Sequence, residues 1–489
     1  MISAANLSPG PSETVLPRNF LPFWVLLAIS VALASGLVAQ FISPALVLET
    51  MGVCVVLIMV PVRWPYGALG VLLAASLMPR FTISIGGWNA RPEHYAIALI
   101  VVWLLLRRVF AGSQGVPLIG ADYCIAAYIL WNYVSSVLAS PDPKQTLRWA
   151  LLNNLAILPY FIIRVLAVNR TVLEWLFKVF VLTGIIESGY AILAFVCHHL
   201  IGSTFGVEVD QYAAGLGGIY GTQYEPNLLG SYCACLAIIL IVLYFANVSR
   251  SRWLIAGIVV ALAAMLFSLA RAALLSFVLI SVFLLVWGLL CGKLRLGAVL
   301  PLLIILCLLL VPVAVLGGKN VAARFSNWSE EGLQADTDTM GRFVAWSAAI
   351  QNIAEHPIVG NGTASFQLVA DARELPILGN RPWVGNSAIR ILHDTGIIGL
   401  ALFGLVIIAF GKQVRRVTKF HQRGTEWIVA LSAGCLIYAL AFLSTDGTML
   451  GFFWVHLGLL ASACVFFKPT LSASTVRTAV SLGSSFSTY

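Results

Sequence analysis

Two arginines lie where a positive charge is costly and therefore informative. Arg271 stands between two apolar runs, 253–268 and 272–292, with almost no loop around it. A bare guanidinium at the centre of a membrane helix costs ~2.5–3.5 kcal/mol on insertion scales. Arg271 therefore either snorkels from the membrane interface to lipid phosphates or faces the protein and binds an anion. Arg342 begins an amphipathic segment, as a solvated surface residue or as a second arm of the same anion site.

A diphosphate is the anion that a pair of arginines would suit best. The planar guanidinium binds two oxygens at once and keeps its charge at physiological pH. Arg373, Arg381 and Arg390 add positive charge to the same region, although a surface position explains each of them taken singly.

Other ionisable residues offer weaker signals. Glu187 lies inside an apolar run, where a carboxylate is functional by default unless a neighbouring base or hydroxyl pairs with it. The adjacent His198 and His199 point in different directions on a helix, and none of the nine cysteines has metal-ligand spacing. We therefore expect neither a metal site nor a cofactor.

The composition of the chain that positions these side chains is that of a membrane protein. Hydrophobic residues form 60% of the 489-residue chain and charged residues only 10%, against ~25% charged in soluble domains. Apolar runs of about the ~20 residues needed to cross a bilayer cover most of the sequence. The net charge of +9 lacks a dense basic cluster interleaved with aromatics, so we expect no nucleic-acid partner.

We predict an all-α bundle of about 12–14 transmembrane spans. The fourteen candidates are 21–39, 44–61, 66–79, 95–106, 121–139, 147–164, 173–196, 227–248, 253–268, 272–292, 297–316, 388–411, 427–444 and 449–467. With a cytoplasmic N-terminus, the inner loops then hold most of the basic residues. These are Arg107, Arg108, Arg164, Arg170, Arg250, Arg252, Lys293 and Arg295, and the dense group Lys412, Arg415, Arg416, Lys419 and Arg423.

This orientation divides the chain into five parts. We expect a cytoplasmic N-terminus (1–20), a bundle with short loops (21–316), a large periplasmic loop (317–387), the last spans (388–467) and a cytoplasmic tail (468–489). A loop as long as 317–387 is usually functional. Within it, Phe343, Trp346, Ile350 and Ile353 recur at helical spacing. They predict an amphipathic helix that lies on the membrane surface or packs over the bundle.

Several short motifs appear in a fixed order between about residues 220 and 460. They are Glu225-Pro-Asn227, Ser268-Leu-Ala-Arg-Ala-Ala273, Gly341-Arg-Phe-Val-Ala-Trp346, Glu355-His-Pro-Ile-Val-Gly-Asn-Gly362, and Asn386-Ser-Ala-Ile-Arg-Ile-Leu-His-Asp-Thr-Gly396 with Gly399. Together with the long outer loop, they resemble the signature region of the O-antigen ligase-related family of bacterial membrane proteins.

The resemblance implies a multi-pass inner-membrane glycosyltransferase of the GT-C type that works without metal. Its donor is a glycan on undecaprenyl diphosphate, and its acceptor is another glycan or a lipid. The two arginines that hold the diphosphate in the family correspond to Arg271 and Arg342. Membrane lipids and proteins of polysaccharide assembly are the other partners. We expect Tyr224, Asn227, Arg381, Asn386 and Arg390 to bind the substrate.

One position departs from the family pattern. Ligases of the family carry a His-Asn pair before the span that follows the long loop, and here the pair is Gly385-Asn386. His393 is no substitute, because it falls about two turns inside the helix. The general base is then a carboxylate on the outer side, namely Glu225, Asp371 or Glu374, and such a base would add ~10²–10⁴-fold to the rate.

The missing histidine favours polymerisation of repeat units over ligation. Two alternatives stay open. One is a transporter, because some members of the broad family are linked to bicarbonate uptake, and Glu187 would then be its central ionisable group. The other is a non-catalytic protein that only binds the lipid carrier.

Overall fold

The computed structural model describes the chain from residue 66 to residue 467, with gaps. The described residues are 66–85, 88–111, 116–208, 218–246, 248, 252–290, 337–368, 383–419 and 424–467. The predicted spans 21–39, 44–61 and 297–316, the tail 468–489, and the candidates Asp371, Glu374 and Arg381 lie outside this part of the chain.

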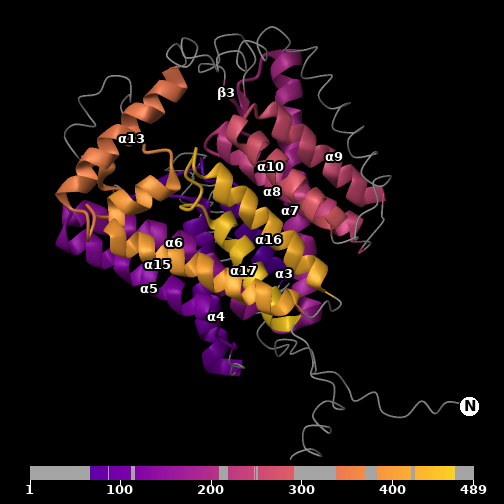
Figure 1. The fold of residues 1–489 in the computed structure, drawn as a ribbon, viewed down its shortest axis with the longest axis horizontal. Coiled ribbons are helices and arrows are strands. Elements are labelled where there is room, and N and C mark those ends of the chain that lie inside the picture. The colour runs from indigo at the N-terminus through magenta and orange to yellow at the C-terminus, as the bar shows by residue number, and fades with distance from the viewer. Residues whose placement is uncertain are drawn as a thin grey trace, which may run out of the picture.

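Twelve α-helices make up most of the described chain (Figure 1). They are α3 (Tyr66–Ser76), α4 (Pro92–Ala111), α5 (Gly120–Leu138), α6 (Pro143–Leu166), α7 (Arg170–Ile201), α8 (Pro226–Phe245), α9 (Arg252–Phe267), α10 (Arg271–Leu290), α13 (Thr337–Glu355), α15 (Ser387–Thr418), α16 (Thr425–Ala441) and α17 (Gly451–Phe466). Each predicted span in this part of the chain coincides with one of these helices.

The other described elements are small. Two antiparallel hairpins pair β1 (Ile83–Ile85) with β2 (Trp88–Ala90) and β3 (Val207–Glu208) with β4 (Gly218–Ile219). A short 3-10 helix covers Ser365–Leu368. Five of the described helices, α6, α7, α8, α10 and α15, are long and apolar enough to cross a membrane. The predicted all-α, multi-pass class is therefore confirmed.

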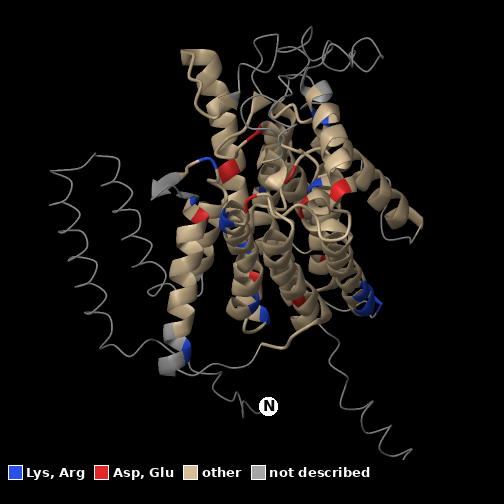
Figure 2. Cartoon of the chain, turned by 90° about the vertical axis from the view of Figure 1, so that its left-hand side faces the viewer, with Lys and Arg blue, Asp and Glu red and all other residues tan. Residues whose placement is uncertain are grey.

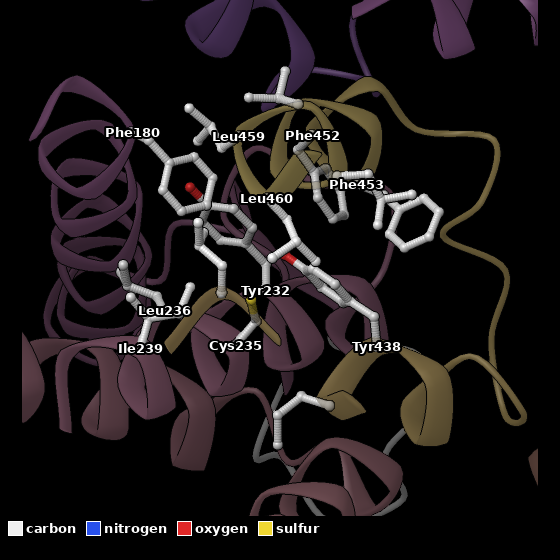
Figure 3. Packing of buried hydrophobic residues seen from close by; sticks show 14 of the residues in the cluster. Phe180, Tyr232, Cys235, Leu236, Ile239, Tyr438, Phe452, Phe453, Leu459 and Leu460 are labelled. Carbon is white, nitrogen blue, oxygen red and sulfur yellow. The ribbon is translucent and has the colours of Figure 1, made fainter. Parts of the chain in front are cut away.

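Helix α8 lies at the centre of the bundle and is buried along nearly its whole length. It packs against α9, α10 and α16, while α17 packs against α6 and α15 against α5. Figure 3 shows the contact region, where Tyr232 and Cys235 of α8 face Tyr438 of α16 and Phe452 of α17. Small residues allow this close approach, as is usual between membrane helices: a Cβ on Gly434 would lie 2.7 Å from the Cys235 sulfur.

Successive helices run in opposite directions, so the bundle has two distinct ends. At the first, which we call the Asn386 end, Gly451 N donates to Glu93 Oε2 (3.0 Å) and Ser387 N donates to Phe442 O (2.9 Å). At the opposite, Arg164 end, Arg164 pairs with Asp122 at 3.3 Å. Charged side chains occur at both ends and at several levels between them (Figure 2).

Helix α13 confirms the amphipathic helix expected in the long loop, and it ends just before His356 and Pro357. Its buried apolar side chains, however, are Ala345, Ala348 and Ala349. They pack with Phe366 and Val384 in a small core beside α15. Of the larger apolar residues used for the prediction, Trp346 packs partly buried against this core, whereas Phe343 and Ile350 are exposed.

Candidate functional site

The loop between α16 and α17, residues 443–450, organises the Asn386 end. It follows Phe442, which closes the last turn of α16 through Phe442 N donating to Tyr438 O. Two of its consecutive residues, Ser444 and Thr445, reach two of the predicted catalytic residues. Arg342 Nη1 donates to Ser444 O and, at 3.2 Å, to Ser444 Oγ. Thr445 Oγ1 donates to Glu225 Oε1.

These two contacts join residues that are far apart in sequence. Arg342 comes from α13, 102 positions before Ser444. Glu225 stands immediately before α8, 220 positions before Thr445. An arginine and a carboxylate, both predicted to act on the substrate, are therefore held by neighbouring residues of one loop.

Asn386 belongs to the same cluster. Its Oδ1 accepts hydrogen bonds from the backbone N–H groups of Ala388 (2.9 Å) and Ile389 (3.1 Å), so it is the N-cap of α15. Its Nδ2 donates to Leu443 O at 2.8 Å. Both polar ends of the side chain are thus engaged in fixing the start of α15 against the α16–α17 loop.

Arg390 has an internal role in the described structure. Its side chain is buried and pairs with Asp394 (3.2 Å) and Asp446, and it donates to Thr448 Oγ1 at 2.7 Å. Asp446 also accepts from Ser387 Oγ at 2.8 Å. A buried ion pair is costly to break from one side. Arg390 therefore ties the α16–α17 loop to α15, and its contact with substrate stays a prediction.

Two glycines of the family motifs build a backbone junction under this cluster. Gly396 interrupts α15 with φ +65° and ψ −170°, and Gly360 has φ +83°. A Cβ on Gly396 would lie 2.2 Å from Ile358 O, and one on Gly360 would lie 2.5 Å from backbone atoms of α15. Only glycine allows the two segments to approach so closely.

The break in α15 leaves backbone N–H and C=O groups without partners inside the helix, and the segment 357–362 forms hydrogen bonds with them. Ile397 N and Ile398 N donate to Pro357 O (2.9 Å) and Ile358 O (3.4 Å). In return, the carbonyls of His393 and Asp394 accept from Asn361 N and Gly362 N, both at 2.9 Å. The segment 357–362 and the break in α15 are therefore one structural unit that supports the site.

The burial of His393 and the space around Gly385 bear on the histidine that is missing from the family pattern. His393 is fully buried and its Nδ1 lies 3.0 Å from Asp394 Oδ1, so it does not reach the surface of the site. Gly385 precedes the cap of α15 with φ +61°, and a Cβ placed there would meet no atom within 4 Å. The position where family ligases carry histidine is spatially open in this chain.

Arg271 is the first residue of α10, and the turn before it is as short as the sequence suggested. The turn packs against the first part of α8, because a Cβ on Gly230 would lie 2.6 Å from both Ala270 Cβ and Ser268 Oγ. Asn227 lies one helical turn before Gly230, and its carbonyl accepts from Ser231 Oγ (2.6 Å). Arg271 is thus at the same end of α8 as Glu225.

Tyr224 is partly exposed beside a cluster that the sequence analysis did not identify. Arg91 Nη2 donates to Met449 O at 2.8 Å and pairs with Glu93 Oε1 at 2.7 Å. Partial desolvation raises the pKa of Tyr224, an effect that the nearby guanidinium of Arg91 opposes. The phenol therefore stays a hydrogen-bond donor at neutral pH. Arg91 precedes a short apolar helix, and no motif distinguished it.

Glu187 is occupied by hydrogen bonds to the segment before α8. Its Oε1 accepts from Thr222 N at 3.0 Å, and its Oε2 lies 2.9 Å from Thr222 Oγ1. The same hydroxyl also donates to Leu77 O. Glu187 thus ties α7, α3 and the segment 220–223 together.

The fold and this cluster define a class: a multi-pass membrane protein with a polar site built from distant segments at one end of its helices. Among the described residues, no three His, Cys, Asp or Glu side chains are grouped to hold a metal. Residues 256–404 match the family model described as O-antigen ligase. No curated protein matches the chain.

The match supports a relationship of this chain to the O-antigen ligase-related proteins of bacterial membranes, whose activity is glycosyltransferase-like. The matched segment runs from α9 into α15 and includes Arg271, Arg342, Asn386 and Arg390.

Proposed function

We propose that this protein polymerises undecaprenyl-diphosphate-linked oligosaccharide at the periplasmic face of the inner membrane. The Asn386 end of the bundle faces the periplasm in this proposal. The observation that carries it is the α16–α17 loop, which holds Arg342 through Ser444 and Glu225 through Thr445. An anion-binding side chain and a base are thereby brought to one end of the bundle, where a lipid-linked diphosphate can enter from the leaflet.

The roles follow from the charge changes in the reaction. A hydroxyl of the acceptor glycan attacks the anomeric carbon of the donor, and the bond from that carbon to the diphosphate oxygen breaks. Negative charge grows on the departing undecaprenyl diphosphate, where Arg271 and Arg342 stabilise it. Glu225 takes the proton of the attacking hydroxyl. Asp371 and Glu374 remain the alternative bases from the long loop.

The proposal favours polymerisation over ligation because of Gly385. A ligase of the family would place an imidazole there, and this chain has open space and a hydrogen atom instead. Tyr224, Asn227 and Asn386 border the same region and are proposed to contact the sugars or the diphosphate. Arg381 is kept as a proposed contact on its sequence position alone.

The test uses purified full-length protein in nanodiscs with undecaprenyl-diphosphate-linked oligosaccharide. Polymerisation gives a ladder of products that differ by one repeat unit, whereas ligation gives a single added glycan on a lipid acceptor. The Arg342→Ala variant, shown to be folded by its elution volume, should lose most of the product. Gln351→Ala, an exposed change on the same helix, should keep it.

The contrary result is also informative. If unmodified protein turns over none of several donors and acceptors, the enzyme proposal fails. Binding of the donor without turnover would then indicate a lipid-carrier-binding protein. Uptake of bicarbonate into proteoliposomes would indicate the transporter alternative.

A further inference from the structure

Helix α13 docks onto the bundle mainly through small residues and leaves two large apolar residues, Phe343 and Ile350, exposed. The buried side is formed by Ala345, Ala348, Ala349 and Asn352. On another side, the side chains of Phe343 and Ile350 are 51% and 57% exposed. These two residues are seven positions apart, or about two turns, so they share one face of the helix. Exposed apolar side chains that adjoin one another, rather than being scattered singly, commonly mark an interaction surface.

Aromatic residues extend this face beyond the pair. The Trp346 ring lies edge-on to Phe343 with centroids 5.4 Å apart. Its Nε1 donates to Val384 O at 2.8 Å, next to Trp383, whose side chain is 46% exposed. We call the exposed Phe343 and Ile350, with the partly buried Trp346 at their edge and Trp383 of the neighbouring segment, the outer face of α13. Two tryptophans beside aliphatic side chains are typical of the zone where a membrane meets water.

The neighbouring helix indicates what covers this face. α13 packs against α15, which is long and apolar enough to cross the membrane. The outward residues of α15 include Ile397 and Leu405, which are 53% and 47% exposed and therefore face lipid in a membrane. Figure 1 shows α13 at the margin of the molecule beside α15. The outer face of α13 thus lies next to α15, whose exposed apolar residues would contact acyl chains if the helix spans the membrane.

We propose that the outer face of α13 is embedded in the membrane leaflet at the Asn386 end of the bundle. Its occupant is phospholipid, with Phe343 and Ile350 among the acyl chains and the tryptophans at headgroup depth. A helix with one apolar face commonly lies in the interface plane in this way.

The position of Arg342 gives the embedding a functional consequence. Arg342 precedes Phe343 on α13, and Ser444 of the bundle holds its guanidinium. With Phe343 in the leaflet, Arg342 lies near the depth of the lipid phosphates. That is where the diphosphate of a membrane-bound donor is found, so this consequence rests on the proposed function. The embedding of α13 in the leaflet does not depend on the proposed function.

Spin labelling tests the embedding directly and without substrate. The nine native cysteines are replaced by alanine, and single cysteines at position 343 or 350 carry a nitroxide. The protein is placed in nanodiscs of phosphatidylethanolamine and phosphatidylglycerol. Oxygen, which is enriched among acyl chains, and a water-soluble nickel chelate then compete to relax the label. Leu405→Cys is the lipid control and Lys144→Cys, at an exposed helix start, is the water control.

We expect labels at 343 and 350 to collide with oxygen more than with nickel, as at position 405. Nickel collisions that match position 144 would show that the face is in water. Low collision rates with both reagents would show that protein covers it. Either of these two results overturns the proposal. If the position 343 variant elutes as misfolded protein, position 350, which lies at the middle of the exposed face, decides alone.

Discussion

Replacing Gly396 by alanine should damage the junction under the candidate site more than its small size suggests. Gly396 has a left-handed backbone, and the added Cβ would lie 2.2 Å from Ile358 O, 2.4 Å from Ile358 C and 2.6 Å from Gly360 N. All three atoms belong to the backbone, so no side chain can rotate away. The segment 357–362 must move as a unit, or α15 must change its path.

The size of the effect follows from two contributions. A left-handed conformation costs an L-residue about 1–2 kcal/mol. Separation of the two segments also weakens the hydrogen bonds from Ile397 N to Pro357 O and from Asn361 N to His393 O, each with a net value of about 0.5–1.5 kcal/mol. We therefore expect a loss of about 2–5 kcal/mol in stability.

The same helix supplies a matched control. Gly404 has helical backbone geometry and a Cβ there would meet nothing within 4 Å. Gly404→Ala should be neutral or stabilise α15 by about 0.5–1 kcal/mol.

Thermal unfolding in detergent, followed by a thiol-reactive dye that labels buried cysteines as they become exposed, compares the three proteins. We expect the melting temperature of Gly396→Ala to lie well below that of the native chain, and that of Gly404→Ala to be equal to it or higher. Equal melting temperatures for the two variants would refute this explanation. The two glycines differ in their backbone angles and in the atoms that an added Cβ would contact, so the two variants should differ as well.

Three further predictions concern the site and its orientation. Arg271→Lys should impair glycan transfer nearly as much as Arg271→Ala, because a point charge cannot bind two oxygens as the guanidinium fork does. A fully active Lys variant in the glycan-ladder assay would show that Arg271 is only an anchor at the membrane interface. Thr445→Val should lower the transfer rate about 10-fold or more, since a hydrogen bond to a charged group is worth about 1.5–3 kcal/mol. Thr445→Ser keeps the hydroxyl that donates to Glu225 and should retain activity; equal rates for the two variants would remove this role. A cysteine at the exposed position Lys144 should react with an impermeant thiol reagent in intact spheroplasts, and one at Arg416 should react only after lysis.

The sequence alone determined the helical spans of the described chain and their order. Apolar length located the spans, because a bilayer fixes how many residues a helix needs to cross it. The spacing of 343, 346, 350 and 353 predicted α13, and its end before Pro357 followed from the lost N–H of proline. The motifs around Gly360 and Gly396 marked the family. Nothing local, however, indicated that these two glycines touch.

Only the tertiary structure decided which residues meet. Ser444, Thr445 and Asp446 form an ordinary polar turn in sequence, and their importance comes from contacts with segments up to 220 positions away. Arg390 looked like one more basic residue near the long loop, and burial between two aspartates gave it an internal role. Periodicity did not predict the docking side of α13 either, because alanines pack closely beside α15 while Phe343 and Ile350 stay exposed. Helical periodicity identifies an apolar face, but the shape of the partner surface decides which face packs.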